Sequence, residues 1–236
     1  MRRVVAFLGA LVLVAWILVP FYLLAIAALT PPDLLSAYPK PLVPSAVSPA
    51  SLETFRDAAG IAPATINSVA VAVIAVLVAL VAGAPAGYAL GRFTFRGRDG
   101  VVAAASIGRF FPLAVLAVPA ALMLARIGLY DSVVALGVMH GAIALPFVIL
   151  VIARAVALAR PWPGIAAAAV LSFLISWNEV FAATVLTVQL RTLPAQVFAS
   201  LATSPLSYKL AGAVVLVVPS LLAFLLIRRT FVRVWR

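Results

Sequence analysis

Few side chains in this sequence could do chemistry, and only some of those lie within apolar segments. The 236 residues include one histidine, six carboxylates and no cysteine. Disulfides, thiol catalysis and cysteine-based metal sites are therefore excluded. An intramembrane enzyme would need a nucleophile with a base, or a pair of metal ligands, and the sequence shows neither pattern.

Glu179 is the most informative carboxylate. It follows Trp177 and Asn178 in an apolar segment. If that segment is a helix, Glu179 lies ~24 Å from its start, because a helix rises 1.5 Å per residue. A carboxylate within a membrane span is costly and usually faces a cavity or a partner. Trp177, Asn178 and Glu179 are therefore candidates for a transport pathway or its gate. The alternative is a hydrated carboxylate near the interface, with Trp177 as an aromatic anchor.

Arg109 is the second charge within an apolar segment, ~14 Å from its start and near the bilayer centre. It should face protein or water rather than lipid, so it is also a pathway candidate. An ion pair with Glu179 is one hypothesis, although the two expected depths differ by ~10 Å. Contact with a partner subunit or a solute is the other. His140, in the middle of its segment, reads as a hydrogen-bonded packing residue rather than a proton relay.

The composition is that of a multi-pass membrane protein. Hydrophobic residues make up 66%, charged residues 10%, and the mean hydropathy is +1.25. Soluble domains have about 45–50% apolar and about 25% charged residues, so a soluble, disordered or fibrous chain is excluded. We expect an all-α fold whose single transmembrane domain fills residues 1–236. Six helices are expected near 4–29, 65–91, 101–125, 132–154, 163–187 and 210–228.

The positive charge is distributed unevenly over the connecting segments. With both termini cytoplasmic, the inside segments carry +10 of the net +11. This bias predicts the orientation and favours contact with anionic lipids rather than nucleic acid. The outside loops are then 30–64, with a helix-like stretch at 51–59, and 188–209.

Several motifs in a fixed order resemble the smaller permease of the maltose transporter and related carbohydrate ABC importers. They run from Asn67-Ser68 to Trp177-Asn178-Glu179 and so span about half of the chain. In chain order they are Asn67-Ser68, Gly87–Phe93 with Phe95–Arg98, Phe111-Pro112, Ile127–Ser132, Ala144–Phe147, Pro163–Ala166, and Phe173 with Trp177–Glu179.

The resemblance implies a type I ABC importer permease fold in the plasma membrane of a prokaryote. It also implies a sugar or related carbohydrate as solute, a second permease, two cytoplasmic ATPase subunits and an extracytoplasmic solute-binding protein. ATP and magnesium would bind the ATPases, so this chain would be no enzyme and would hold no cofactor or metal. The loop before the last helix would contact the binding protein. Its candidate tip is Thr203, Ser204, Pro205, Leu206, Ser207 and Tyr208.

One departure from the family pattern concerns coupling to the ATPases. The family carries a long cytoplasmic loop with an E-A-A…D-G pattern between its fourth and fifth helices. Here Arg154 and Pro161 are too close for that loop, and neither dipeptide occurs there. Omitted residues, a deletion, and coupling through another surface all remain open. The candidate ATPase-facing residues are Arg92, Arg96, Arg98, Arg154 and Arg160.

Two alternatives to an importer subunit follow. A truncated permease acting only as a membrane scaffold fits the missing loop. An ion-coupled secondary carrier would show ionisable pairs and inverted repeats, which the sequence lacks.

Overall fold

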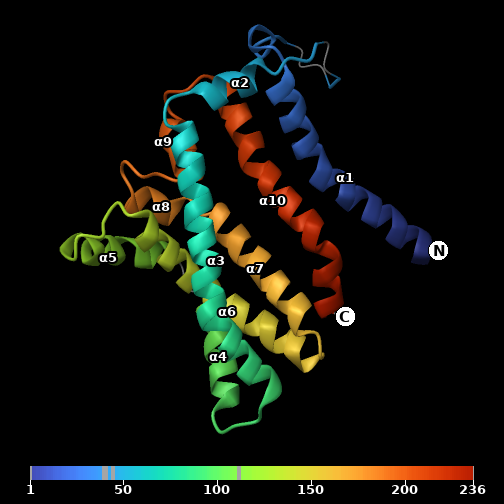
Figure 1. The fold of residues 1–236 in the computed structure, drawn as a ribbon. Helices are drawn as coiled ribbons and strands as arrows, with labels where there is room; N and C mark the ends of the chain where they lie inside the picture. The colour runs from blue at the N-terminus through green and yellow to red at the C-terminus, as the bar shows by residue number, and fades with distance from the viewer. Residues whose placement is uncertain (1, 39–41, 44–45, 111–112, 236) are drawn as a thin grey trace. The chain divides into compact units, whose positions relative to one another are not determined.

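The computed structural model describes residues 2–38, 42–43, 46–110 and 113–235, which form helices and connections without a strand. This confirms the predicted all-α class (Figure 1). In chain order the helices are α1 (Arg2–Leu29), the 3₁₀ helix η1 (Pro32–Leu34), α2 (Ala50–Asp57), α3 (Ile61–Arg92), α4 (Arg98–Gly108), α5 (Leu113–Arg126), α6 (Val133–Ala157), α7 (Pro161–Trp177), α8 (Phe181–Leu186), α9 (Leu193–Ser200) and α10 (Leu206–Trp235).

The chain divides into two compact units. Unit 1 comprises Met1–Ala59 and Ser200–Val217, and unit 2 comprises Gly60–Ala199 and Val218–Arg236. Helix α10 therefore contributes its first part to unit 1 and its remainder to unit 2.

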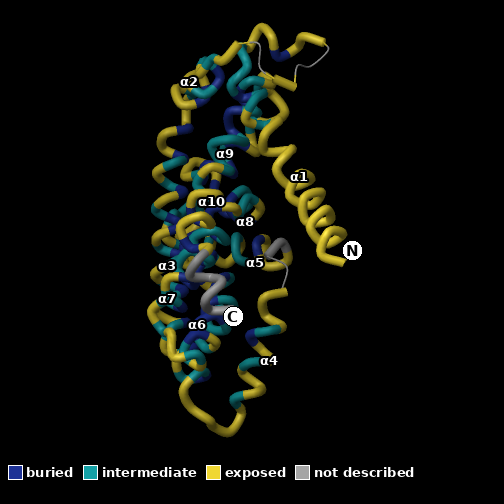
Figure 2. The backbone as a smooth tube through the Cα atoms, turned by 90° about the vertical axis from the view of Figure 1, so that its right-hand side faces the viewer, coloured by how far each residue is buried: buried dark blue, intermediate teal, exposed yellow. Residues whose placement is uncertain are grey.

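In unit 1, α2 packs against the start of α10. Phe55 is buried, and its ring centroid lies 4.8 Å from that of Tyr208. Helix α1, by contrast, is exposed along almost its whole length, with Ala28 its buried residue (Figure 2). An apolar surface of this extent is covered by lipid or by another subunit, because soluble proteins rarely leave such surfaces open to water.

Unit 2 is built around the close pairing of α3 with α6, and α7 packs against both. Glycines make this approach possible. A Cβ atom on Gly87 would lie 2.8 Å from the Ile149 carbonyl oxygen, and one on Gly141 would lie 2.7 Å from Val78 Cβ. Both distances are shorter than normal contact, so only glycine allows the observed helix spacing.

The glycines recur at four-residue spacing on both helices. Gly83, Gly87 and Gly91 follow one face of α3, and Gly137 and Gly141 lie on α6. This is the G-x-x-x-G pattern of close membrane-helix contacts. The prediction that no span contains G-x-x-x-G is therefore wrong, because the pattern overlaps the Gly87–Phe93 motif on α3 and lies in an apolar run on α6. It is the main packing device of the unit.

Four of the six expected spans correspond to single long helices. The helical segments Arg2–Leu29, Ile61–Arg92, Val133–Ala157 and Leu206–Arg228 are long and apolar enough to cross a membrane. They match the predictions near 4–29, 65–91, 132–154 and 210–228. Val115–Arg126 and Pro161–Trp177 are apolar but shorter.

The other two expected spans are each broken, which corrects the prediction of continuous helices. The span expected at 101–125 consists of α4 and α5, and α5 runs across the direction of α3 (Figure 1). The Phe111-Pro112 motif lies outside the described residues. The span expected at 163–187 consists of α7 and α8, with the break at 178–180. The loop expected at 188–209 also contains α9, which the sequence pattern did not predict.

Helices α6 and α7 are joined by only three residues. This confirms the prediction that the segment between Arg154 and Pro161 is too short for the coupling loop of the family. The N–H of Arg160 donates to the Ala155 carbonyl at 2.8 Å, and the N–H of Ala159 donates to the Val156 carbonyl at 2.9 Å. Ala159 has a φ of 55°. These bonds and this left-handed residue form a Schellman motif, which ends α6 and reverses the chain at once.

Candidate functional site

Glu179 stabilises the break between α7 and α8. Its two carboxylate oxygens accept hydrogen bonds from the backbone N–H groups of Ala182 at 2.9 Å and Ala183 at 3.0 Å. A carboxylate at these positions satisfies N–H groups that a helix start leaves unpaired, and it complements the helix dipole. The side chain is 11% exposed. Glu179 is therefore the residue that lets the chain restart as a helix after the break.

His140 joins α6 to this break. Its Nδ1 lies 2.9 Å from Ser176 Oγ, and its Nε2 lies 3.4 Å from Glu179 Oε2. The second approach is a close polar contact without hydrogen-bond alignment, since Nε2 has no aligned partner among the described residues. His140 is wholly buried. This agrees with the expected packing role, and it adds a contact to Glu179 that sequence analysis did not foresee.

The Ser176–His140–Glu179 cluster resembles a hydrolase triad in composition only. His140 is 0% exposed and Ser176 is 5% exposed, so no substrate reaches the hydroxyl. The imidazole also presents Nδ1 to the serine, whereas the hydrolase arrangement uses Nε2. Both Glu179 oxygens are occupied by the start of α8. The geometry supports a structural junction rather than a nucleophile.

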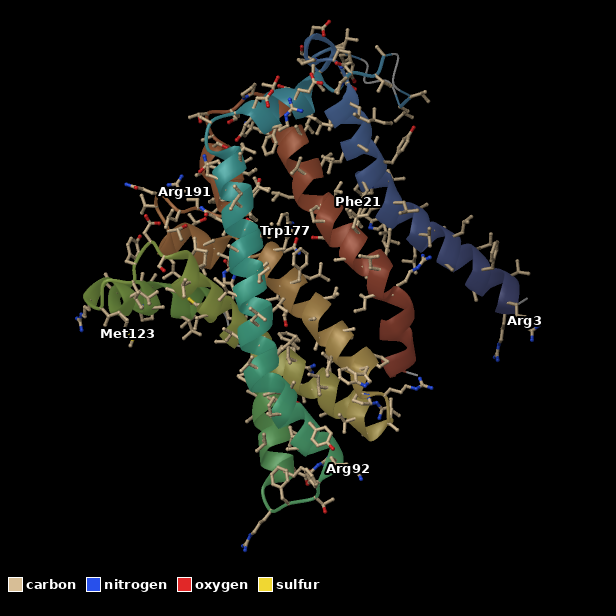
Figure 3. All side chains as sticks on the ribbon, in the orientation of Figure 1. Arg3, Phe21, Arg92, Met123, Trp177 and Arg191 are labelled. Atoms are coloured by element: carbon tan, nitrogen blue, oxygen red, sulfur yellow. The ribbon has the colours of Figure 1, made fainter. Side chains whose placement is uncertain are left out.

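Trp177 and Asn178 secure the other side of the break. Trp177, labelled in Figure 3, is buried, and its ring stacks on Phe173 with 5.7 Å between centroids. The Asn178 amide nitrogen donates to the Leu174 carbonyl at 2.8 Å. It also lies 3.1 Å from the Ser220 hydroxyl, which is 3.2 Å from the Asn178 carbonyl oxygen. The Trp-Asn-Glu motif thus connects α6, α7, α8 and the second part of α10.

Arg109 is not part of this junction, so the hypothesis of an Arg109–Glu179 ion pair is wrong. The Arg109 Nε donates to the Ser106 carbonyl at 3.2 Å, and its guanidinium carbon lies 5.0 Å from the Phe110 ring centroid. The imidazole of His140 lies beside the Glu179 carboxylate instead. Arg109 therefore contacts the end of α4, whereas Glu179 contacts α6 and α8.

The Ile127–Ser132 motif has a role that its sequence alone did not indicate. The Asp131 carboxylate accepts hydrogen bonds from the N–H groups of Val188 at 2.9 Å, Leu190 at 3.0 Å and Gln189 at 3.1 Å. Burial raises the pKa of Asp131, but these bonds and the charge of Arg191 outweigh it, so the pKa lies below the ordinary value. The motif therefore holds the segment that follows α8.

Neighbouring motif residues complete this anchor. The Tyr130 hydroxyl donates to the Val185 carbonyl at 3.0 Å, and Ser132 Oγ accepts from the Ala135 N–H at 3.3 Å to cap α6. From α3, the Asn67 amide donates to the Arg191 carbonyl at 3.1 Å, and Ser68 Oγ accepts from the Leu193 N–H at 2.7 Å. Motifs far apart in sequence thus converge on residues 185–193.

The five candidate ATPase-facing arginines come from one end of unit 2. Arg92 ends α3 (Figure 3), and Arg98 begins α4 while its Nε donates to the Leu90 carbonyl at 3.0 Å. A Cβ on Gly91 would lie 2.5 Å from the Ala153 carbonyl oxygen, so the end of α3 adjoins that of α6, which carries Arg154. Arg160 precedes α7 and Arg96 is exposed between α3 and α4. Their contact with an ATPase stays a prediction.

The candidate binding-protein loop is partly inside a helix. Leu206, Ser207 and Tyr208 belong to α10, and Tyr208 is buried on Phe55. Thr203 and Pro205 are exposed and Ser204 is half-buried. The accessible tip therefore precedes Tyr208, and contact with a binding protein stays a prediction. No group of acidic and histidine side chains among the described residues could hold a metal ion.

Comparisons with known proteins agree with the motif order. The chain is 27% identical to the trehalose transport system permease protein SugB of Mycobacterium tuberculosis, over 81% of each chain. The alignment is 228 positions long, whereas 81% of these 236 residues is a smaller number. The alignment therefore includes positions that have no counterpart in this chain. No protein-family model matches the chain.

A solved structure shares the architecture. A bacterial ABC transporter that imports the acidic polysaccharide alginate contains a chain that matches with a TM-score of 0.70 and 18% identity, over 96% of both chains. This likeness establishes the fold. In motif order and in sequence, the chain is similar to a permease subunit of a carbohydrate transport system.

Proposed function

We propose that this chain forms half of the translocation pathway of an ATP-driven saccharide importer. A second permease would complete the pathway, two cytoplasmic ATPases would drive it, and an extracytoplasmic binding protein would deliver the solute. The chain would lie in the plasma membrane of a prokaryote with its N-terminus inside, among anionic lipids. ATP and magnesium would bind the ATPases. The two similar proteins act on trehalose and on alginate, so saccharide is the chemistry that they share.

The convergence of the family motifs carries this proposal. Asn67-Ser68, Tyr130–Ser132 and Trp177–Glu179 come from separate helices, yet each stabilises α8 or the segment that follows it. The motifs occur together because their residues all stabilise the same part of the fold. Broken helices of this kind often line solute pathways in transporters.

Co-purification tests the proposal. The tagged chain, extracted from its own membranes, is expected to bring down an ATPase and a second permease. After reconstitution, saccharide with its binding protein should stimulate ATP hydrolysis. A chain that purifies alone would contradict the proposal.

A scaffold without transport activity is the second candidate, and the α6–α7 turn favours it. Three residues, closed by the Schellman motif, leave no segment there that could reach into an ATPase. The scaffold role would be supported if the chain purified with all the expected subunits but saccharide did not stimulate ATP hydrolysis by that complex. Sequencing the codons between Arg154 and Pro161 in genomic DNA would show whether the turn is native.

A further inference from the structure

A cavity of about 180 Å³ lies beside the break between α4 and α5. Its walls come from the end of α4, from α5 and from α6. Residues that line it include Gly108, Arg109, Leu116, Met139, Ile143 and Pro146. Arg109 is the charged residue among the described residues that line it, and the others are apolar.

The cavity lies at the middle level of α6. Pro146 is near the centre of the 25-residue helix Val133–Ala157, ~20 Å from its start and ~17 Å from its end at 1.5 Å per residue. A Cβ atom on Gly108 would lie 3.6 Å from Pro146 Cγ, so the end of α4 adjoins this level. Arg109 follows directly. Arg109 therefore adjoins the middle of α6, a helix that is long and apolar enough to cross a membrane.

No acidic side chain among the described residues neutralises Arg109. The recorded ion pairs join Arg56 to Asp57, Arg98 to Asp99 and His140 to Glu179. Arg109 is exposed, and its described contacts are the Ser106 carbonyl and the Phe110 ring. The other charge in the expected spans, Glu179, is bound to the start of α8. Of these two charged side chains, Arg109 is therefore available to a negatively charged ligand, whereas the Glu179 carboxylate is occupied.

We propose that Arg109 and this cavity bind an acidic group of the transported saccharide, a carboxylate, sulfate or phosphate. The inference rests on the proposed function and narrows its solute to an anionic saccharide. A guanidinium pairs with such groups through two parallel hydrogen bonds, and its unused terminal nitrogens are available for them. The cavity is smaller than the roughly 300–1,000 Å³ of sites for whole drug-sized ligands, so it holds one group of a passing solute.

Uptake by intact cells tests this assignment with the whole importer present. Cells of the source organism would carry the chain as wild type, Arg109→Gln, Arg109→Lys or Arg126→Gln. Radiolabelled glucuronate-containing and neutral glucose-containing disaccharides serve as probes. We expect Arg109→Gln to reduce uptake of the acidic probe at least tenfold, and Arg109→Lys to retain part of it. Arg126→Gln removes an exposed charge from the end of α5 and should leave uptake unchanged.

Three results would overturn the assignment while leaving the importer proposal intact. They are uptake of neutral saccharide alone, acidic uptake that Arg109→Gln does not change, and equal loss of both probes in Arg109→Gln, which would mean a structural role. If no variant and no wild-type cell takes up any saccharide through this chain, the proposed function itself fails, and the assignment with it.

A lipid headgroup has the same phosphate chemistry, so binding is also measured directly. The full chain would be placed in nanodiscs of phosphatidylcholine or of phosphatidylglycerol, with labelled glucuronate as the probe. Arg109-dependent binding in both lipids supports a solute group. Loss of that binding in phosphatidylglycerol would assign the site to lipid and overturn the proposal. Unchanged melting of Arg109→Gln shows that the variant is folded.

Discussion

The carboxylate of Asp131 accepts a hydrogen bond of 2.9 Å from the backbone N–H of Val188, 57 residues further along the chain. The same carboxylate also accepts from Gln189 and Leu190. Asp131 itself has a φ of 56°, a conformation that is unusual for a residue with a side chain. The backbone is thus held in a strained form that aims the carboxylate at three N–H groups.

Replacing Asp131 should loosen the segment after α8. Asp131→Ala leaves three N–H groups without their acceptor and is expected to cost about 1–3 kcal/mol of stability. Asp131→Asn keeps one acceptor oxygen and a residue that tolerates positive φ, so it should cost less. Thermal unfolding in detergent, with proteolysis at residues 187–193, measures both. Equal melting temperatures for wild type and Asp131→Ala would contradict this account of the anchor.

The anchor also predicts a dependence on pH. The folded state lowers the pKa of Asp131 below its ordinary value of 3.8, so the folded state favours the ionised form. The stability that this provides is complete above that value and is lost as the pH falls through the lower folded pKa. The difference in melting temperature between wild type and Asp131→Asn should therefore be constant near neutral pH and shrink below about pH 4.

A methyl group on Gly87 should disturb the pairing of α3 with α6. The added Cβ would meet the Ile149 carbonyl oxygen and Ile152 Cβ at 2.8 Å, and a backbone oxygen cannot move away alone. Gly87→Ala is expected to cost about 1–3 kcal/mol. Gly100→Ala is the matched control, because nothing lies within 4 Å of its added Cβ, and it should be neutral or slightly stabilising. Similar losses in both variants would refute the close-packing explanation.

The two helix ends with Schellman bonds predict opposite effects of exchanging glycine and alanine. Gly128 ends α5 with a φ of 72°, and Ala159 ends α6 with a φ of 55°. Gly128→Ala should destabilise by about 1 kcal/mol, since a Cβ is disfavoured in the left-handed region. Ala159→Gly relieves the same strain and should raise the melting temperature. The gain in the free energy of unfolding should be less than about 1 kcal/mol, because glycine also gains entropy in the unfolded state. A lower melting temperature for Ala159→Gly would contradict the turn described here.

Glu179→Gln tests whether the break between α7 and α8 matters to transport. Glutamine offers one acceptor oxygen to two N–H groups and removes the charge beside His140. We expect about 1–3 kcal/mol of destabilisation and altered uptake, with the subunits still assembled. His140→Asn, which keeps a polar group beside Ser176, should give a smaller change. Unchanged uptake kinetics in Glu179→Gln would confine this residue to a structural role.

The long helices were predictable because each is an uninterrupted apolar run. Segments such as Ile61–Arg92 and Val133–Ala157 are predominantly apolar and exceed the length of a membrane span. The short turn between α6 and α7 followed from the few residues between Arg154 and Pro161. In these regions the local composition is sufficient to predict the secondary structure.

The breaks and the anchors were less predictable because they depend on distant partners. The sequence 163–187 is apolar enough for one helix, and only the bonds from Glu179 to Ala182 and Ala183 show that a new helix starts there. The partner of Asp131 lies 57 residues away at Val188. An ion pair between Glu179 and Arg109 was one hypothesis, but the side chain that lies beside the Glu179 carboxylate is His140 on α6.

Saccharide-stimulated ATP hydrolysis tests the central claim most directly. The chain would be purified with its associated subunits, reconstituted in vesicles, and assayed with the solute-binding protein and its saccharide. The account predicts an associated ATPase whose hydrolysis rises when the loaded binding protein is added, together with saccharide accumulation in the vesicles. A chain without an ATPase partner, or with one that does not respond to saccharide, would contradict it.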